Sequence, residues 1–174
     1  MIYPYHVMVM RLTSDANEGK LSRIISLESL HTDKVIAADG NTITMTGYPT
    51  PVSGDKRVGD AWKNGLRYAQ QLVVKNKGGK ISVVDGAKLK VEDADEIIVL
   101  MSAATNYVQC MDDSYCYFSE EDPLDKVRAT LHKVADKKYT SLLAAHQKDY
   151  HSLYDRMQLN LGEQLEAPAA TTDS

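Results

Sequence analysis

Hydrophobic and polar residues alternate with a period of two through most of the chain. Successive side chains of a strand point to opposite faces, so this alternation predicts β-strands. The predicted strands are short and are separated by turn residues such as Asp39-Gly40-Asn41. Short strands at near-regular spacing favour an antiparallel β-sandwich. The predicted strands cover residues 5–13, 20–28, 35–37, 42–46, 66–75, 81–84, 88–91 and 96–103.

Two of these strands carry apolar residues on both faces. Residues 97–101 form an uninterrupted apolar run, which predicts a central strand that is covered on both sides. In the strand over 5–13, Val7 and Val9 alternate with Met8 and Met10. We therefore expect this strand also to be sandwiched or central.

The hydrophobic period changes at Asp122-Pro123, where a helix is predicted to begin. Aspartate suits the N-cap and proline suits the first helical position. The apolar stripe of this helix consists of Leu124, Val127, Leu131 and Val134. A second helix is predicted from near Thr140 or Ser141 to about Met157, with one broad face formed by Leu142, Leu143, His146, Tyr150, Leu153, Tyr154 and Met157.

These patterns together predict a mainly β protein, an antiparallel β-sandwich followed by two C-terminal α-helices. The expected division is a sandwich segment over residues 1–121, linker helices over 122–160 and a polar tail over 161–174. The tail has the composition of a linker.

Composition and charge narrow the class of function. The chain has 174 residues and a formal net charge of -4, which allows one buried core and indicates no nucleic-acid or membrane partner. No apolar run reaches membrane-spanning length, and the start lacks the features of a signal peptide. No cofactor is predicted.

Cys110 and Cys116 are the two cysteines of the chain. Their spacing permits a small loop disulfide in an oxidising compartment, and two free thiols are the alternative. Because no histidine or second cysteine pair lies at a usable spacing, no metal site is predicted here.

No catalytic residue is predicted. The acidic residues gather in turns and at the start of the first helix, where solvation and the helix dipole account for them. On the second helix, His146 and His151 lie about 140° apart around the axis, which disfavours a shared metal. Four residues of this helix are instead predicted to make structural linker contacts with a sheet or a barrel: His146, Tyr150, Tyr154 and Arg156.

Trp62 and Tyr48 are the candidate carbohydrate contacts. Trp62 is the single tryptophan and lies in a long Gly-rich, charged loop, with Tyr48 upstream. Aromatic rings stack on the apolar faces of sugars. The alternative is that Trp62 anchors the loop to the sandwich.

Several short segments, in this order and at this spacing, carry a resemblance to a known family. They are Gly65-Leu66-Arg67-Tyr68, Ala94-Asp95-Glu96, Ala103-Ala104-Thr105-Asn106-Tyr107, His146, Asp149-Tyr150, Tyr154-Asp155-Arg156 and Leu159-Asn160-Leu161-Gly162. From about residue 3 to residue 163 the chain resembles part of glycoside hydrolase family 95, the α-L-fucosidases and related α-L-galactosidases. The matching part is the back half of the N-terminal β-sandwich with the helical linker.

The resemblance implies where the chemistry of such an enzyme takes place. In that family an (α/α)6 barrel follows the linker and carries the catalytic carboxylate and its partner asparagines. An incomplete, super-sandwich-like fold without catalytic residues is therefore implied, with the barrel beginning after about residue 174. A bacterial parent protein that is secreted or periplasmic is also implied.

Two functions are expected from these observations. The first is non-catalytic support of a barrel that acts on α-L-fucosides or α-L-galactosides, and the alternative is a stand-alone carbohydrate-binding or interaction module. The expected partners are the catalytic domain and an oligosaccharide. Open strand edges and an uncovered apolar face also predict a homodimer.

Overall fold

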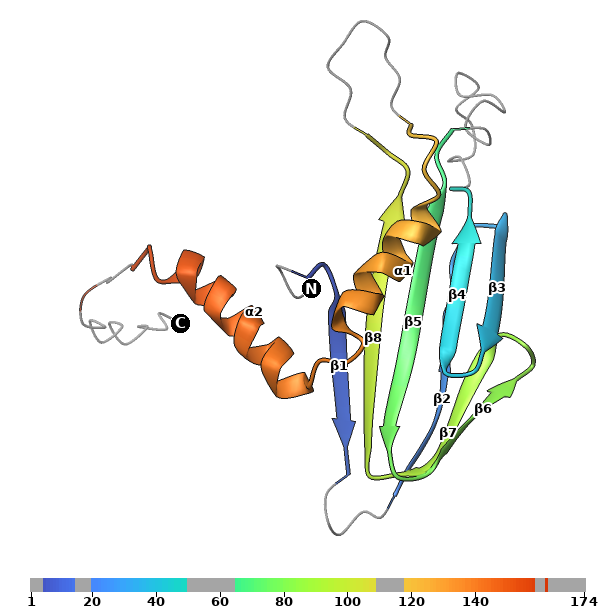
Figure 1. Ribbon diagram of the computed structural model, residues 1–174, viewed down its shortest axis with the longest axis horizontal. Coiled ribbons are helices and arrows are strands. Elements are labelled where there is room, and N and C mark those ends of the chain that lie inside the picture. Colours follow the sequence, from blue (N-terminus) through green and yellow to red (C-terminus); the bar gives the residue numbers. More distant parts are fainter. Residues whose placement is uncertain (1–4, 15–19, 50–64, 109–117, 159–161, 163–174) are drawn as a thin grey trace, which may run out of the picture.

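The computed structural model describes residues 5–14, 20–49, 65–108, 118–158 and 162. Within these residues the chain forms eight strands followed by two helices (Figure 1). The elements are β1 (Met8–Thr13), β2 (Leu21–Ser26), β3 (Lys34–Asp39), β4 (Thr42–Gly47), β5 (Tyr68–Lys77), β6 (Lys80–Val84), β7 (Lys88–Ala94), β8 (Glu96–Thr105), α1 (Pro123–Val134) and α2 (Tyr139–Tyr154).

The strands form two antiparallel sheets that pack face to face. One sheet has the order β1-β8-β5-β4-β3 and the other has the order β2-β7-β6. Figure 1 shows α1 lying over β5 and β8, on the face of the larger sheet that is turned away from the smaller one. The prediction of a mainly β, antiparallel sandwich followed by two C-terminal helices is confirmed.

Turn residues account for the tight connections between neighbouring strands. Gly40, between β3 and β4, has a φ of 56°. Asp85 and Gly86, between β6 and β7, have φ values of 53° and 66°. Positive φ values at the first turn residues suit hairpin turns that follow the right-handed twist of the strands they join. The sequence-based prediction of hairpin turns at these positions is confirmed.

Two hydrophobic cores lie on opposite faces of the larger sheet. On β8, Ile97 and Val99 face the smaller sheet, whereas Leu100 faces α1. The predicted coverage of this strand on both faces is therefore confirmed. The inner core contains Leu21, Ile43, Leu72, Val74, Leu89, Val91, Ala94, Ile97 and Val99, and the outer core contains Val7, Ala69, Leu100, Val127, Leu131, Val134 and Leu142.

The position of β1 corrects one prediction. Among the described strands, β1 lies at the edge of the larger sheet and pairs with β8 alone. Met8 and Met10 are 43% and 54% exposed. Apolar residues on both faces show what a strand can bury, but they carry no information on how many strands pair with it. The expectation of a sandwiched or central strand was therefore wrong.

The two helices begin close to their predicted positions. The Asp122 carboxylate accepts a hydrogen bond from the Leu124 amide at 2.9 Å, and Pro123 occupies the first turn. The stripe that includes Val127 and Leu131 is buried against the sheet. Helix α2 begins at Tyr139 and projects away from the sandwich (Figure 1).

Candidate functional site

A groove runs beside α1 along the outer face of β3 and β4. It consists of two cavities of about 620 and 490 Å³ that share Val35, Thr46 and Leu124. We call this feature the α1 groove. Its lining residues are Thr32, Asp33, Lys34, Val35, Ala37, Asp39, Thr42, Thr44, Thr46, Gly47, Tyr48, Arg67, Tyr68, Gln71, Asp122, Pro123, Leu124 and Arg128.

The groove exists because α1 is narrower than the sheet beneath it. The helix packs on β5 and β8, and the outer face of β3 and β4 beside it stays open (Figure 1). Val35 is 68% exposed on this open face. The side chains on the open face of β3 and β4 therefore form the floor of the groove, and α1 forms one of its walls.

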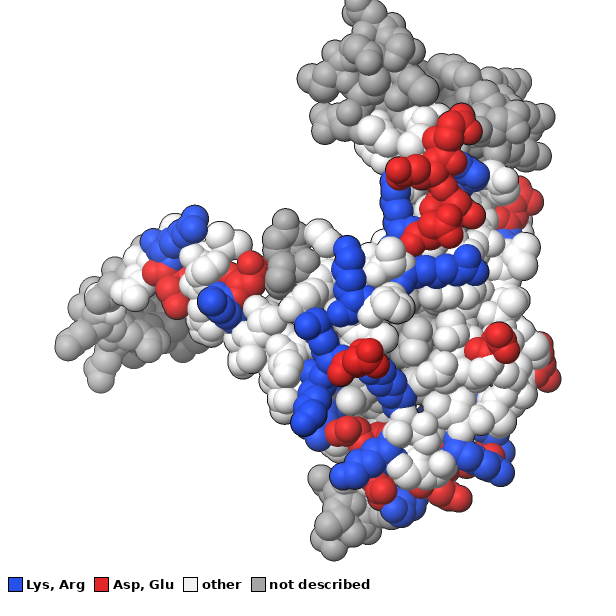
Figure 2. All heavy atoms as spheres, in the orientation of Figure 1, with Lys and Arg blue, Asp and Glu red and all other residues white. Residues whose placement is uncertain are grey.

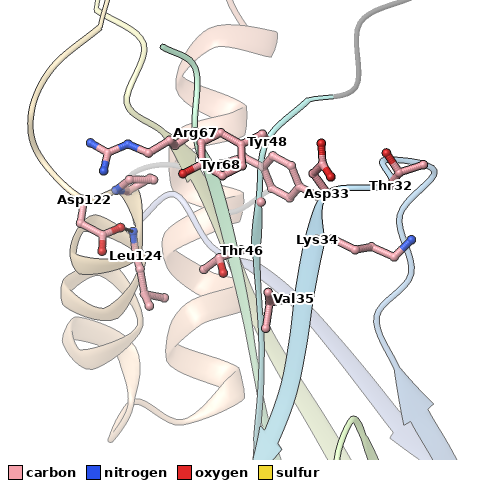
Figure 3. Close-up of a pocket in the computed structure, with 12 residues that line it drawn as sticks. Thr32, Asp33, Lys34, Val35, Thr46, Tyr48, Arg67, Tyr68, Asp122 and Leu124 are labelled. Carbon is pink, nitrogen blue, oxygen red and sulfur yellow. Dashed lines mark hydrogen bonds between the residues drawn. The ribbon is translucent and has the colours of Figure 1, made fainter. Parts of the chain in front are cut away.

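Two tyrosines lie at the centre of the larger cavity. Figure 3 shows the rings of Tyr48 and Tyr68 between Arg67 and Asp122 on the α1 side and the β3 residues on the other. Tyr48 is 38% exposed, so part of its ring is open to a ligand. The predicted carbohydrate contact Tyr48 thus lines the groove, but its predicted role stays a prediction.

Tyr68 packs closely against Gly47, its partner across β4 and β5. A Cβ atom at position 47 would lie 2.8 Å from the Tyr68 hydroxyl oxygen and 2.3 Å from the Asp33 carbonyl oxygen, so only glycine fits. The buried Tyr68 hydroxyl has no hydrogen-bond partner among the described residues. A buried polar group left unsatisfied costs about 1–3 kcal/mol.

The charges around the larger cavity are of mixed sign. Arg67 and Asp122 lie on one side, and Asp33 and Lys34 lie on the other (Figure 3). Lys34 Nζ donates to the carbonyl oxygens of Ser29 and His31 at 2.6 and 3.0 Å. Figure 2 also shows acidic side chains gathered where α1 begins. The groove therefore lacks the excess of free cations that an anion site requires.

A buried asparagine holds together the loops at this end of the sandwich. Asn106 is 2% exposed and accepts a hydrogen bond from the Arg67 amide at 2.7 Å. Its side-chain amide donates to the carbonyl oxygens of Gly65 at 2.8 Å and Ser119 at 3.2 Å. This side chain therefore joins its own loop to residues 65–67 and to Ser119.

Arg67 extends this network to the start of α1. Its guanidinium donates to the carbonyl oxygens of Glu120 at 3.2 Å and Glu121 at 3.4 Å. Sequence reasoning assigned no role to Arg67 or Asn106. The available signal was that both residues lie in the short segments that carry the family resemblance.

The other predicted site residues lie away from the groove. Tyr150 and Tyr154 stack on each other on α2 with ring centroids 5.2 Å apart, and they are 49% and 62% exposed. Arg156 is also exposed. Their predicted contacts with a barrel, together with that of His146, stay predictions. Trp62, Cys110 and Cys116 lie outside the described residues.

The described part of the chain contains no group of three or more metal-ligating side chains. None of the helices there is long and apolar enough to cross a membrane. Two carboxyl groups outside the groove have altered pKa values. Hydrogen bonds from Lys90 and Lys80 lower the pKa of Glu92, and a hydrogen bond from Lys20 lowers the pKa of Asp95.

Comparison with known proteins places the sandwich in a family. Residues 2–110 match the family model described as glycosyl hydrolase family 65, N-terminal domain. The chain belongs to this family. The match of the family 65 N-terminal domain spans all eight described strands and ends before α1.

Two curated relatives extend the similarity beyond the family 65 N-terminal domain itself. The chain is 28% identical to the probable alpha-fucosidase A of Aspergillus niger over 167 residues, which cover 91% of this chain and 19% of the relative. It is 30% identical to alpha-L-fucosidase 2 of Arabidopsis thaliana over 173 residues, 91% of this chain and 20% of that relative.

The chain therefore spans about a fifth of the length of these curated relatives. The resemblance to α-L-fucosidases is confirmed. The relatives come from a fungus and a plant, so the expected bacterial origin stays a prediction, as does export from the cell.

Proposed function

We propose that this chain is a non-catalytic sandwich and linker region of an α-L-fucosidase-like glycoside hydrolase. In this proposal it supports a separate catalytic domain that degrades carbohydrate. The observation that carries the proposal is the match to a glycosyl hydrolase N-terminal domain, together with two α-fucosidase relatives that extend far beyond the matched segment.

The surface of α2 supports a role as a contact element. Its C-terminal end and the residues directly after it expose large apolar side chains, of which Leu153, Tyr154 and Met157 are 59%, 62% and 81% exposed. Within α2, only Leu142 is buried. Contiguous exposed apolar residues mark interaction surfaces, so a catalytic domain is the partner that we propose for this helix.

A binding module is the second candidate function. It is favoured by the α1 groove, which has the size of a ligand site and is lined by Tyr48 and Arg67. The two functions are compatible, because a supporting domain can also hold a substrate chain.

Exchange of the matching segment in a relative tests the supporting role. The matched segment of Arabidopsis alpha-L-fucosidase 2 would be replaced by this chain, and hydrolysis of nitrophenyl α-L-fucoside would be measured. We expect the chimera to retain activity that deletion of the segment abolishes. We also expect the isolated chain to show no turnover above buffer, and turnover that co-purifies with it would contradict the non-catalytic role.

Substitutions on α2 add specificity to this test. Leu153→Glu places a charge in the exposed apolar stripe, and we expect it to lower the activity or the thermal stability of the chimera. Gln147→Glu, at an exposed polar position of the same helix, is the matched control. Equal effects of the two substitutions would argue against a docking role for the stripe.

A further inference from the structure

We propose that the α1 groove binds a neutral saccharide chain, with one sugar ring against Tyr48 in the larger cavity. The inference rests on the carbohydrate context of the proposed function and adds a binding site to it. It needs no catalytic residue in this chain.

The dimensions of the groove suit more than one sugar ring. The larger cavity has a volume of about 620 Å³, inside the range of about 300–1,000 Å³ that is typical of small-molecule sites. It continues into the cavity of about 490 Å³ along β3, β4 and α1. An elongated ligand can therefore leave the larger cavity along the sheet.

The lining offers the two kinds of contact that a pyranose ring needs. A sugar has apolar C–H faces and a polar edge of hydroxyl groups. Tyr48, Val35 and Leu124 supply aromatic and aliphatic surface for the faces. Thr46 supplies a hydroxyl that can donate or accept, and the adjoining cavity adds Thr42 and Thr44.

The charges favour a neutral ligand over an anionic one. Arg67 and Lys34 already donate to backbone carbonyl oxygens. Asp33 and Asp122 line the same cavity and would repel a phosphate or a carboxylate. A hydroxylated, uncharged ring meets both signs of charge without this repulsion.

Binding to the full chain, followed by NMR shifts and calorimetry, tests the inference. The probes are fucosyllactose, lactose and cellobiose as neutral oligosaccharides, L-fucose as a single ring, and inorganic phosphate as the anion. We expect saturable binding of at least one oligosaccharide, more weakly of L-fucose, and none of phosphate. Tyr48→Ala should weaken binding about tenfold through the lost stacking surface.

Two further variants distinguish a loss of sugar binding at the α1 groove from effects of substitution elsewhere in the chain. Thr46→Val removes one hydroxyl and keeps a β-branched residue in β4, and we expect binding to weaken about fivefold. Tyr150→Ala removes a tyrosine of similar exposure on α2 and should leave binding unchanged, with all variants checked for folding by circular dichroism.

Three results would overturn the inference: no saturable binding of any of the three oligosaccharides, unchanged affinity in a folded Tyr48→Ala variant, or competition by phosphate. These three results concern sugar binding alone and are independent of the hydrolytic activity measured in the chimera. A chain that restores the chimera but binds no sugar would therefore refute this site and leave the supporting role intact.

Discussion

Replacing Asn106 with alanine tests the idea that one side chain holds together the loops beside the groove. The substitution removes three hydrogen bonds. The Asn106 side chain accepts one from the Arg67 amide at 2.7 Å, and it donates to the carbonyl oxygens of Gly65 at 2.8 Å and Ser119 at 3.2 Å. Each contributes about 1 kcal/mol net, so we expect the free energy of unfolding to fall by about 3 kcal/mol. This is a large part of the roughly 5–15 kcal/mol that stabilises a typical domain.

Urea unfolding followed by circular dichroism measures this loss, provided that the slope with denaturant is unchanged. Asn106→Asp is a second test variant. Its carboxylate can still accept a hydrogen bond from the Arg67 amide, but it has no proton to donate to the carbonyl oxygens of Gly65 and Ser119. We expect it to cost at least as much as alanine.

Asn76→Ala serves as the matched control. Asn76 is exposed, and its side chain donates to the Gly78 carbonyl oxygen at 2.6 Å. We expect this control to cost less than about 1 kcal/mol. The reasoning is refuted if Asn106→Ala costs no more than the control, or if Asn106→Asp is as stable as the unsubstituted chain.

Two further predictions concern packing and pH. Gly47→Ala should lower the free energy of unfolding by about 1–3 kcal/mol, since its Cβ would lie 2.3 Å from the Asp33 carbonyl oxygen; an unchanged melting temperature would contradict this. The hydrogen bond from Lys20 lowers the pKa of Asp95 below its ordinary value of 3.8. A carboxyl group with a lowered folded pKa stabilises the fold above its unfolded pKa, and this contribution is lost as the pH falls through the folded pKa. We therefore expect the free energy of unfolding to fall between about pH 6 and pH 2, and to fall less in Lys20→Met than in the unsubstituted chain. The same pH dependence in both proteins would contradict a role of Lys20 in lowering the pKa of Asp95.

Local features of the chain were predictable from the sequence alone. The unbroken apolar run over 97–101 predicted a strand covered on both faces, and β8 is buried between the smaller sheet and α1. The Asp122-Pro123 pair predicted the start of α1 because capping depends on neighbouring residues only. The order of the short motifs predicted the relation to α-fucosidases.

The position of β1 and the existence of the groove depended on tertiary structure. Alternation of apolar and polar residues is the same in an edge strand and in an inner one, so it could not place β1 at the edge of the larger sheet. The groove combines Val35 and Thr46 from the β3–β4 hairpin with Arg67 and Leu124 from two segments that are distant in the sequence. Strand pairing, register and the direction of α1 bring these residues together, and each depends on long-range backbone contacts that no local pattern encodes.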